Sequence, residues 1–175
     1  TEPMAGRILV AEHDGVYVIV FEGDVRLTLC TTVDDYLEKM FEDADFRSVI
    51  VDLSSTENID STSLGLLAKL SIQADKRFNF RPTLISTRRD ITRILLSMGF
   101  DEVFDLVQEP LEHEEQLAEL PRIVTNDEDV RQRVLDAHKT LMSLNEANQD
   151  AFHDLVAALE AEAPTPKRRA SATKA

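Results

Sequence analysis

One apolar run constrains the fold more than any other part of the chain: residues 49–53, with the sequence Val-Ile-Val-Asp-Leu. The run is short, apolar and rich in β-branched residues, which is typical of a strand buried on both faces. Polar, turn-like residues 54–60 follow it, and from Leu64 onward the apolar residues recur at helical spacing. A buried strand that leads into a long amphipathic helix predicts an α/β fold.

Strand and helix patterns alternate on both sides of this unit. Strand patterns occur at residues 7–12, 16–21, 49–53, 82–87 and 103–107. The turn His13-Asp14-Gly15 joins the first two. Gly23-Asp24 breaks the second strand, and residues 25–29 are expected to extend it past a bulge. Three helices are predicted. The first is capped by Thr31 or Thr32, the second covers residues 61–77, and the third contains Ile91 to Met98 and ends at Gly99. This order predicts a mixed β-sheet with helices packed on it.

Composition limits the classes of function. With 175 residues, of which 43% are hydrophobic, the chain can bury one ordinary core and carry an appendage. No apolar run approaches the roughly 20 residues that cross a bilayer, and no secretory leader pattern is present, so we expect a cytoplasmic protein. The net charge of −14 disfavours nucleic acid and anionic membranes as partners, which leaves another protein as the expected partner.

The sequence gives no sign of a catalytic, cofactor or metal site. Cys30 is the single cysteine, which excludes an intrachain disulfide and a cysteine-rich metal site, and we expect it to be a half-buried apolar residue. The four histidines lack metal-ligand spacing and are expected on the surface: His13, His113, His138 and His153. No glycine-rich, phosphate-cradling loop occurs among the 5 glycines. We therefore predict a protein that is not an enzyme.

The segment 60–65, Asp-Ser-Thr-Ser-Leu-Gly, places hydroxyl groups at the entrance of the long helix. Asp60 or Ser61 is predicted to cap this helix by accepting hydrogen bonds from free backbone N–H groups. A phosphate attached at this point would meet the same donors and the positive end of the helix dipole. Two interpretations follow, a plain helix cap and a regulated phosphorylation site.

Residues 7 to about 108 resemble a STAS domain, the fold of bacterial anti-sigma factor antagonists. Three matches carry the resemblance, and they occur in the family's order. They are the turn Phe21-Glu22-Gly23-Asp24, the strand, loop and Asp-Ser-Thr-x-Leu-Gly sequence at 49–65, and the strand, Arg-x-Leu helix and glycine at 85–100.

The resemblance implies a partner-switching cycle. In such systems the dephosphorylated antagonist binds an anti-sigma factor or a serine kinase of the histidine-kinase-like ATPase type, phosphorylation breaks that contact, and a PP2C-type phosphatase restores it. The family's acceptor position corresponds to Ser61, with Thr62 as the alternative, and Asp60 would position the loop. Ser63 stands where the family often has glycine, so a third hydroxyl enters the site.

The same resemblance implies a partner-binding surface around the acceptor. Its expected members are Asp24, Asn58, Ile59, Asp60, Ser61, Thr62, Ser63 and Leu64. For Asp24, Asn58 and Ile59, the alternative is a role as turn residues only. Solvated faces are the preferred interpretation for Lys69, Lys76, Arg77 and Arg81, and also for Arg88, Arg89 and Arg93, for which anion binding is the alternative. A second function class is a STAS module that works without phosphorylation, as a structural subunit or a ligand sensor.

The composition changes near Pro110 and again at Pro164, which divides the chain into a STAS domain at 1–110, a helical extension at 111–163 and a basic, disordered tail at 164–175. Residues 111–120 have modest helical character. From residue 127 apolar residues recur every three or four positions, which predicts one long helix or a helical hairpin. Its apolar stripe could pack against the domain itself, or form a homodimer or a second partner surface.

Overall fold

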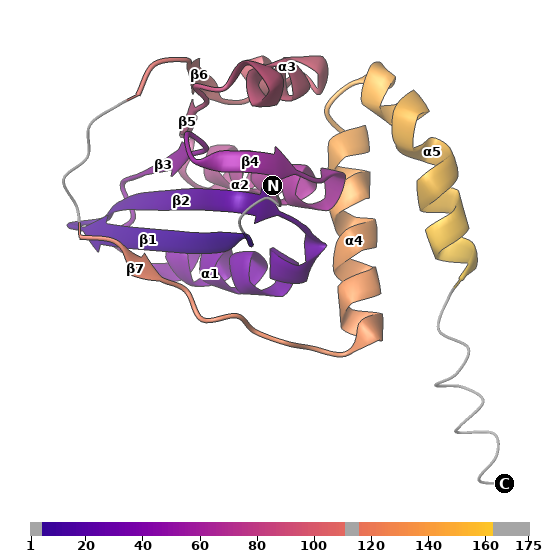
Figure 1. Cartoon of the computed structure of the whole chain (residues 1–175), viewed down its shortest axis with the longest axis horizontal. Coiled ribbons are helices and arrows are strands. Elements are labelled where there is room, and N and C mark those ends of the chain that lie inside the picture. The colour runs from indigo at the N-terminus through magenta and orange to yellow at the C-terminus, as the bar shows by residue number, and fades with distance from the viewer. Residues whose placement is uncertain (1–4, 111–115, 163–175) are drawn as a thin grey trace, which may run out of the picture.

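The computed structural model describes residues 5–110 and 116–162, which form one seven-stranded sheet and five α-helices (Figure 1). The strands are β1 (Arg7–His13), β2 (Val16–Val25), β3 (Ser48–Asp52), β4 (Thr56–Ile59), β5 (Thr83–Ile85), β6 (Asp105–Val107) and β7 (Ala118–Glu119). The helices are α1 (Cys30–Glu42), α2 (Ser61–Phe78), α3 (Arg89–Ser97), α4 (Asp127–Met142) and α5 (Glu146–Ala161). The α/β fold class and the mixed sheet predicted from the sequence are confirmed.

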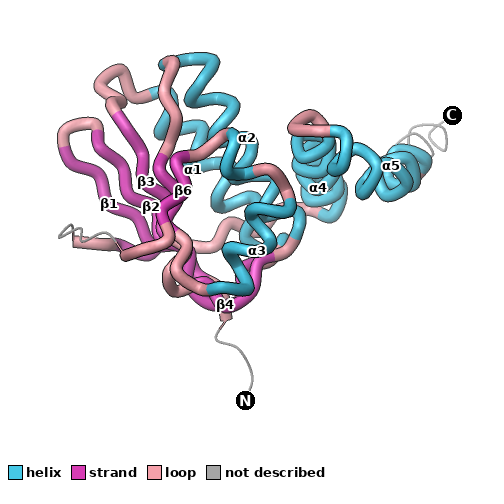
Figure 2. Tube along the Cα trace, turned by 90° about the horizontal axis from the view of Figure 1, so that it is seen from above, coloured by secondary structure: helices cyan, strands magenta, loops and turns pink. Residues whose placement is uncertain are grey.

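The sheet is antiparallel on one side and parallel on the other. Its order is β6-β5-β3-β2-β1-β7, and β4 pairs with the far end of β2. β1 pairs antiparallel with β2 and β7, whereas β2, β3, β5 and β6 run parallel. Figure 2 shows α1, α2 and α3 on one face of the sheet, with α4 and α5 beyond them on the same side. The molecule is therefore layered as sheet, helices and then a second helical layer.

The core lies between the sheet and α1 and α2. Val49 and Val51 of β3 are fully buried and belong to this core. They meet the inner face of α2, where Leu67 and Leu70 are also buried. β-Branched residues favour strands and leucine favours helices, so the intrinsic preferences of these residues match the elements in which they are buried. The helix α2 is thereby fixed between the sheet below it and α4 above it.

Several predicted elements differ from the structure. Residues 54–60 were expected to be a polar turn, but 56–59 form β4, whose pairing partner β2 lies more than 30 residues earlier in the chain. Residues 27–29 form a 3-10 helix and do not extend the strand, although the irregularity at Gly23-Asp24 is present. The expected helical character of residues 111–120 is wrong at 118–119, which form β7, while 111–115 lie outside the described residues.

The extension ends in a helical hairpin and not in one long helix. Asn145 stops the run by capping α5, because its side chain accepts a hydrogen bond from the Asn148 backbone N–H at 2.8 Å. The apolar stripe of α4 packs within the chain, since Ala137 and Leu141 are buried and α4 lies against α2 and α1. The tail at 164–175 lies outside the described residues.

The core position of α2 gives a first prediction. Leu70→Ala removes a side chain that is fully buried, so the free energy of unfolding in urea should fall by about 2–5 kcal/mol. The control is Lys76→Ala on the exposed part of the same helix, which should change this free energy by less than about 0.5 kcal/mol. Equal losses from the two variants would contradict the burial of this face of α2.

Candidate functional site

Three elements converge at the start of α2. The end of β2 pairs with β4, which sets Asp24 opposite Asn58 and Val25 opposite Ile59. The Asp60 backbone N–H then donates to the Val25 carbonyl at 3.1 Å, which ties the entrance of α2 to the same strand. The residues that the sequence analysis assigned to a partner surface, Asp24, Asn58, Ile59 and 60–64, therefore lie together in space.

Asp60 holds this arrangement with both oxygens of its carboxylate. Oδ1 accepts a hydrogen bond from the Ser63 backbone N–H at 2.9 Å, which is the N-cap of α2. Oδ2 accepts from the Leu27 backbone N–H at 2.7 Å, in the segment after β2. Of the two capping residues considered from the sequence, Asp60 is thus the cap, and Ser61 is the first residue of the helix.

The hydroxyl groups at this helix entrance differ in exposure. Ser61 is half-buried, whereas Thr62 and Ser63 are only 3% and 4% exposed. Leu64 is buried with them, while Asn58 is exposed at the end of β4. A phosphate group needs room outside the protein surface, so Ser61 is the better placed acceptor of the three hydroxyls.

Asp24 lies beside the site, and only one of its two carboxylate oxygens accepts a hydrogen bond from the described residues. Its Oδ2 accepts a hydrogen bond from Arg26 Nε at 2.7 Å, and that hydrogen bond and the carboxylate charge raise the pKa of Arg26. Its Oδ1 is buried and has no hydrogen-bond partner among the described residues. A buried carboxylate oxygen without a donor is unfavourable. Asp24 therefore offers an acceptor position beside Asn58.

The hydroxyl of Ser61 contacts a residue 77 positions away. Ser61 Oγ lies 2.7 Å from His138 Nε2, and His138 Nδ1 lies 2.7 Å from the Val134 carbonyl oxygen. A carbonyl only accepts hydrogen bonds, so in the neutral ring Nδ1 carries the proton and Nε2 accepts from the serine hydroxyl. His138 is 2% exposed, so its expected surface position is wrong, and Phe152 of α5 packs against its ring edge-to-face at 5.3 Å between centroids.

Gly65 allows the helix that carries His138 to come this close. A Cβ atom at Gly65 would lie 2.3 Å from the Ala137 carbonyl oxygen and 2.6 Å from the Ala137 side chain. Any larger residue at position 65 would therefore collide with the backbone of α4. One helical turn separates this contact from the hydrogen bond between Ser61 and His138, so α4 lies directly on the first turns of α2.

An ionic cluster fixes the same helix pair to α1. Asp34 is buried and pairs through Oδ1 with Lys69 of α2 at 2.7 Å and through Oδ2 with Arg133 of α4. Arg133 also donates to Asp129 at 2.8 Å, and this hydrogen bond holds the pKa of Asp129 below its ordinary value. Burial alone would lower the pKa of Arg133, but Asp129 and Asp34 outweigh it and leave that pKa raised. The expected solvated role of Lys69 is thus wrong.

Polar contacts anchor both ends of α4 as well. Near the start of α4, the Ile123 backbone N–H donates to Thr32 Oγ1 at 2.9 Å, and the hydroxyls of Thr31 and Thr125 lie 3.3 Å apart. Neither threonine caps α1, which begins at Cys30 without a side-chain cap. At the other end, Asn145 and Asn148 donate to the Met98 carbonyl at 3.2 and 3.0 Å.

The comparison with known families agrees with this geometry. The chain matches the family model of the STAS domain over residues 7–118, which is more than half of its length. The chain belongs to the STAS family. The matched range contains strands β1 to β6 and helices α1 to α3, and it ends at Ala118, the first residue of β7. The α4–α5 hairpin lies outside the matched range, so its contacts with Ser61 and Asp34 come from an addition to the STAS domain.

Sequence reasoning missed two residues of this STAS site. His138 follows Ala137 and lies one turn after Val134, at the edge of the apolar stripe of α4, which was a sign that it faces inward. Gly65 stands inside a helical pattern, where glycine weakens a helix and usually has a packing reason. Neither sign identifies the contacting residue, because the two positions are more than 70 residues apart.

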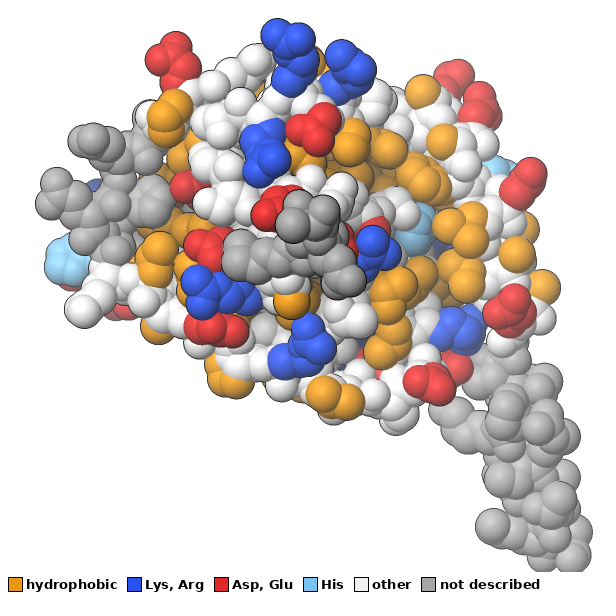
Figure 3. Space-filling view, in the orientation of Figure 1, with side chains coloured by type: hydrophobic (Ala, Val, Ile, Leu, Met, Phe, Trp, Pro, Cys, Tyr) orange, Lys and Arg blue, Asp and Glu red, His pale blue; other side chains and the backbone are white. Residues whose placement is uncertain are grey.

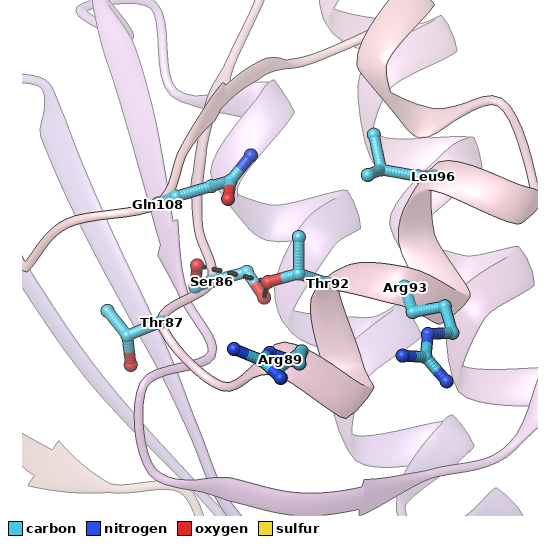
Figure 4. Close-up of a pocket in the computed structure, with 7 residues that line it drawn as sticks. All are labelled: Ser86, Thr87, Arg89, Thr92, Arg93, Leu96 and Gln108. Carbon is cyan, nitrogen blue, oxygen red and sulfur yellow. Dashed lines mark hydrogen bonds between the residues drawn. The ribbon is translucent and has the colours of Figure 1, made fainter.

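A hollow of the STAS domain lies at the start of α3 (Figure 4). It has a volume of about 460 Å³ and is lined by Ser86, Thr87, Arg89, Thr92, Arg93, Leu96 and Gln108. The Ser86 and Thr92 hydroxyls at its base hydrogen-bond each other at 2.7 Å, so they satisfy one another. Arg89 and Arg93 thus share one surface, and their solvated and anion-binding interpretations both stay predictions.

The described residues contain no arrangement typical of a metal site or of a membrane-spanning helix. Within 5–110 and 116–162, no group of three or more His, Cys, Asp or Glu side chains is placed to hold a metal ion. No helix in these ranges has both the length and the apolar character to cross a membrane. Cys30 is fully buried, which raises the pKa of its thiol. His13 and His153 are exposed, as expected, and His113 lies outside the described residues.

The capping carboxylate gives a second prediction. Asp60→Ala removes both acceptors, so the free energy of unfolding should fall by about 1–2 kcal/mol. Asp60→Asn keeps one acceptor oxygen for Ser63 but presents an amide N–H₂ to the Leu27 N–H, so its loss should be smaller than that of the alanine variant. Urea unfolding of the two variants measures the difference, and an alanine variant as stable as the parent would contradict the capping role.

Proposed function

We propose that this STAS protein is an anti-sigma factor antagonist that works by partner switching, with Ser61 as the phosphorylated residue. The observation that carries the proposal is the position of Ser61, a half-buried hydroxyl at the first position of α2 beside the capping Asp60. The partners proposed are an anti-sigma factor or a serine kinase of the histidine-kinase-like ATPase type, and a PP2C-type phosphatase. The pathway implied is bacterial signal transduction in the cytoplasm that regulates transcription.

Electrostatics explains why a phosphate here would act as a switch. The first turn of α2 contains no acidic residue, and its free N–H groups and the helix dipole favour an added anion. A phosphate would bring roughly −1.5 to −2 charges next to Asp60 and Asp24. A partner that accepts the uncharged serine among these carboxylates would then meet strong negative charge. Loss of binding after phosphorylation follows from that change.

A binding function also fits the fold better than catalysis does. STAS domains are typically binding modules without enzymatic activity. The Ser61 and His138 pair has the hydrogen bond of a nucleophile and its base. However, the backbone of Ala137 lies against Gly65 one turn further along α2, which leaves no room for a substrate over this pair. The pair is therefore a packing contact between two helices.

A second candidate is a STAS module that does not depend on phosphorylation. The observation in its favour is that the Ser61 hydroxyl already has a structural use, since it donates to His138. In this role the protein would act as a fixed subunit of another complex or as a ligand sensor. A homodimer is a further alternative for the extension, although the apolar stripe of α4 is already packed on α2 and α1.

The third prediction tests the proposed function. The chain isolated from its native cells should carry phosphate on Ser61 by phosphopeptide mass spectrometry, and Ser61→Ala should lack it. Thr62→Val is the matched control, since it removes a neighbouring buried hydroxyl and should keep the label. An ATPase of the histidine-kinase-like type that co-purifies with the chain from these cells should bind the unmodified chain at least tenfold more tightly than a chain carrying phosphoserine at position 61.

Two outcomes would overturn the proposed function. One is phosphate that persists at the same level in Ser61→Ala, and the other is equal affinity of the ATPase for the two forms. A chain that forms a stable complex in its native cells and never carries phosphate would establish the second candidate.

A further inference from the structure

The α4–α5 hairpin covers the surface on which the proposed function depends. α4 crosses the first turns of α2, with His138 on the Ser61 hydroxyl and Ala137 on Gly65. Figure 3 shows hydrophobic side chains gathered along the junction between the sheet domain and the two C-terminal helices. A protein that binds Ser61 and the face of α2 around Gly65 has to occupy the space that α4 fills, because the two backbones leave no room for a side chain between them at Gly65.

Chemistry at Ser61 is also incompatible with the docked helix. A phosphate ester replaces the hydroxyl proton, so Ser61 Oγ can no longer donate to His138 Nε2. The hydrogen bond of Ser61 to the docked helix is then lost, and the phosphate has to be placed beside a buried imidazole 2.7 Å from the same oxygen. A kinase must align the phosphate of a nucleotide with Ser61 Oγ. The buried His138 ring, 2.7 Å from this oxygen, blocks that approach.

The contacts of α4 are compatible with a helix that detaches from α2. Beside its apolar stripe, α4 is held by the polar contacts of His138 with Ser61 and of Arg133 with Asp34. Asp34 keeps Lys69 as a partner if Arg133 departs, so its carboxylate does not become an isolated buried charge. Figures 1 and 2 show α4 and α5 outside the layer formed by the sheet and α1 to α3. The sheet and α1 to α3 thus form a layer of their own, to which α4 adds the buried side chain of Leu141.

We propose that the α4–α5 hairpin is an intramolecular occupant of the partner-binding face, so that partner binding and phosphorylation at Ser61 both require α4 to leave α2. This inference rests on the proposed function in taking the entrance of α2 as the binding face. The apparent affinity for a partner is then the intrinsic affinity reduced by the fraction of chains in which the hairpin is open. Phosphoserine at position 61 and a docked hairpin exclude one another.

The docked helix also indicates what a competing partner must present. Opposite Gly65 the face accepts backbone or an alanine-sized side chain, opposite Ser61 it offers a hydroxyl donor, and at Asp34 it offers a buried carboxylate. A protein helix with a small residue, a hydrogen-bond acceptor and an Arg or Lys at the spacing of Ala137, His138 and Arg133 fits these three positions. The partner is thus expected to insert a helix that replaces α4.

The fourth prediction opens the hairpin without touching Ser61. Gly65→Ala favours helix formation in α2 but places a Cβ atom against the Ala137 carbonyl oxygen, so it should expel α4. Backbone amides of α4 and α5 should exchange with deuterium at least tenfold faster than in the parent chain, measured by mass spectrometry on the full chain. Amides of β2 and β3 should keep their exchange rates. Lys76→Ala on the exposed part of α2 is the control and should change neither set.

A second variant opens the hairpin from the other side. Arg133→Ala removes the contact with Asp34 and should also speed exchange in α4, whereas Gln132→Ala, at the exposed neighbouring position, should not. Unchanged exchange of α4 in both Gly65→Ala and Arg133→Ala would overturn the inference. Faster exchange that spreads equally through β2 and β3 in both variants would overturn it too, because the hairpin would then be part of the STAS core and not a cover.

The last arm separates this inference from the proposed function. A chain with phosphoserine at position 61 should show the same fast exchange in α4 as Gly65→Ala, and the kinase that labels Ser61 should label Gly65→Ala at least tenfold faster than the parent. If phosphoserine leaves α4 protected, or if the labelling rates are equal, the inference fails while Ser61 remains the acceptor. If Ser61 is never labelled, the proposed function fails, and the exchange data alone still decide whether the hairpin is a cover.

Discussion

The packing of α4 on α2 at Gly65 determines most of what is specific to this chain. Helices ordinarily keep a layer of side chains between their backbones, but here the Ala137 carbonyl oxygen would lie 2.3 Å from a Cβ at position 65. The absence of a side chain at one residue therefore sets the distance between two elements that are far apart in the chain. His138 reaches Ser61 and Arg133 reaches Asp34 as consequences of that distance.

This constraint joins two parts of the molecule with different roles. The STAS domain supplies a helix entrance at which Asp60 orders the backbone and Ser61 presents a hydroxyl. The hairpin supplies the His138 imidazole, which accepts a hydrogen bond from this hydroxyl, and it supplies α4, which fills the space over Ser61. If the hairpin is open in one chain in a hundred, a partner loses a hundredfold in apparent affinity, or about 2.7 kcal/mol. A modest docking free energy is therefore enough to control access to the site.

The sequence predicts the STAS core well because its signals are local. The apolar run at 49–53, the helical spacing after Leu64 and Asp60 before a helix each act over a few residues, and the structure contains β3, α2 and its cap at those places. The prediction failed for β4 and β7, because their polar segments become strands only by pairing with β2 and β1. His138 was placed on the surface for a related reason, since its burial depends on Ser61 and Phe152, which lie in other helices.

The most direct test of the account is the hydrogen bonding of the His138 ring with Ser61. Long-range ¹H–¹⁵N correlation spectra of the full chain at neutral pH report the proton on each ring nitrogen. We expect Nδ1 to carry a proton, because it faces the Val134 carbonyl oxygen, and we expect the Nε2 resonance to shift in Ser61→Ala, because the hydroxyl 2.7 Å away is then absent. His138 resonances that do not change in Ser61→Ala would contradict the claim that α4 covers Ser61.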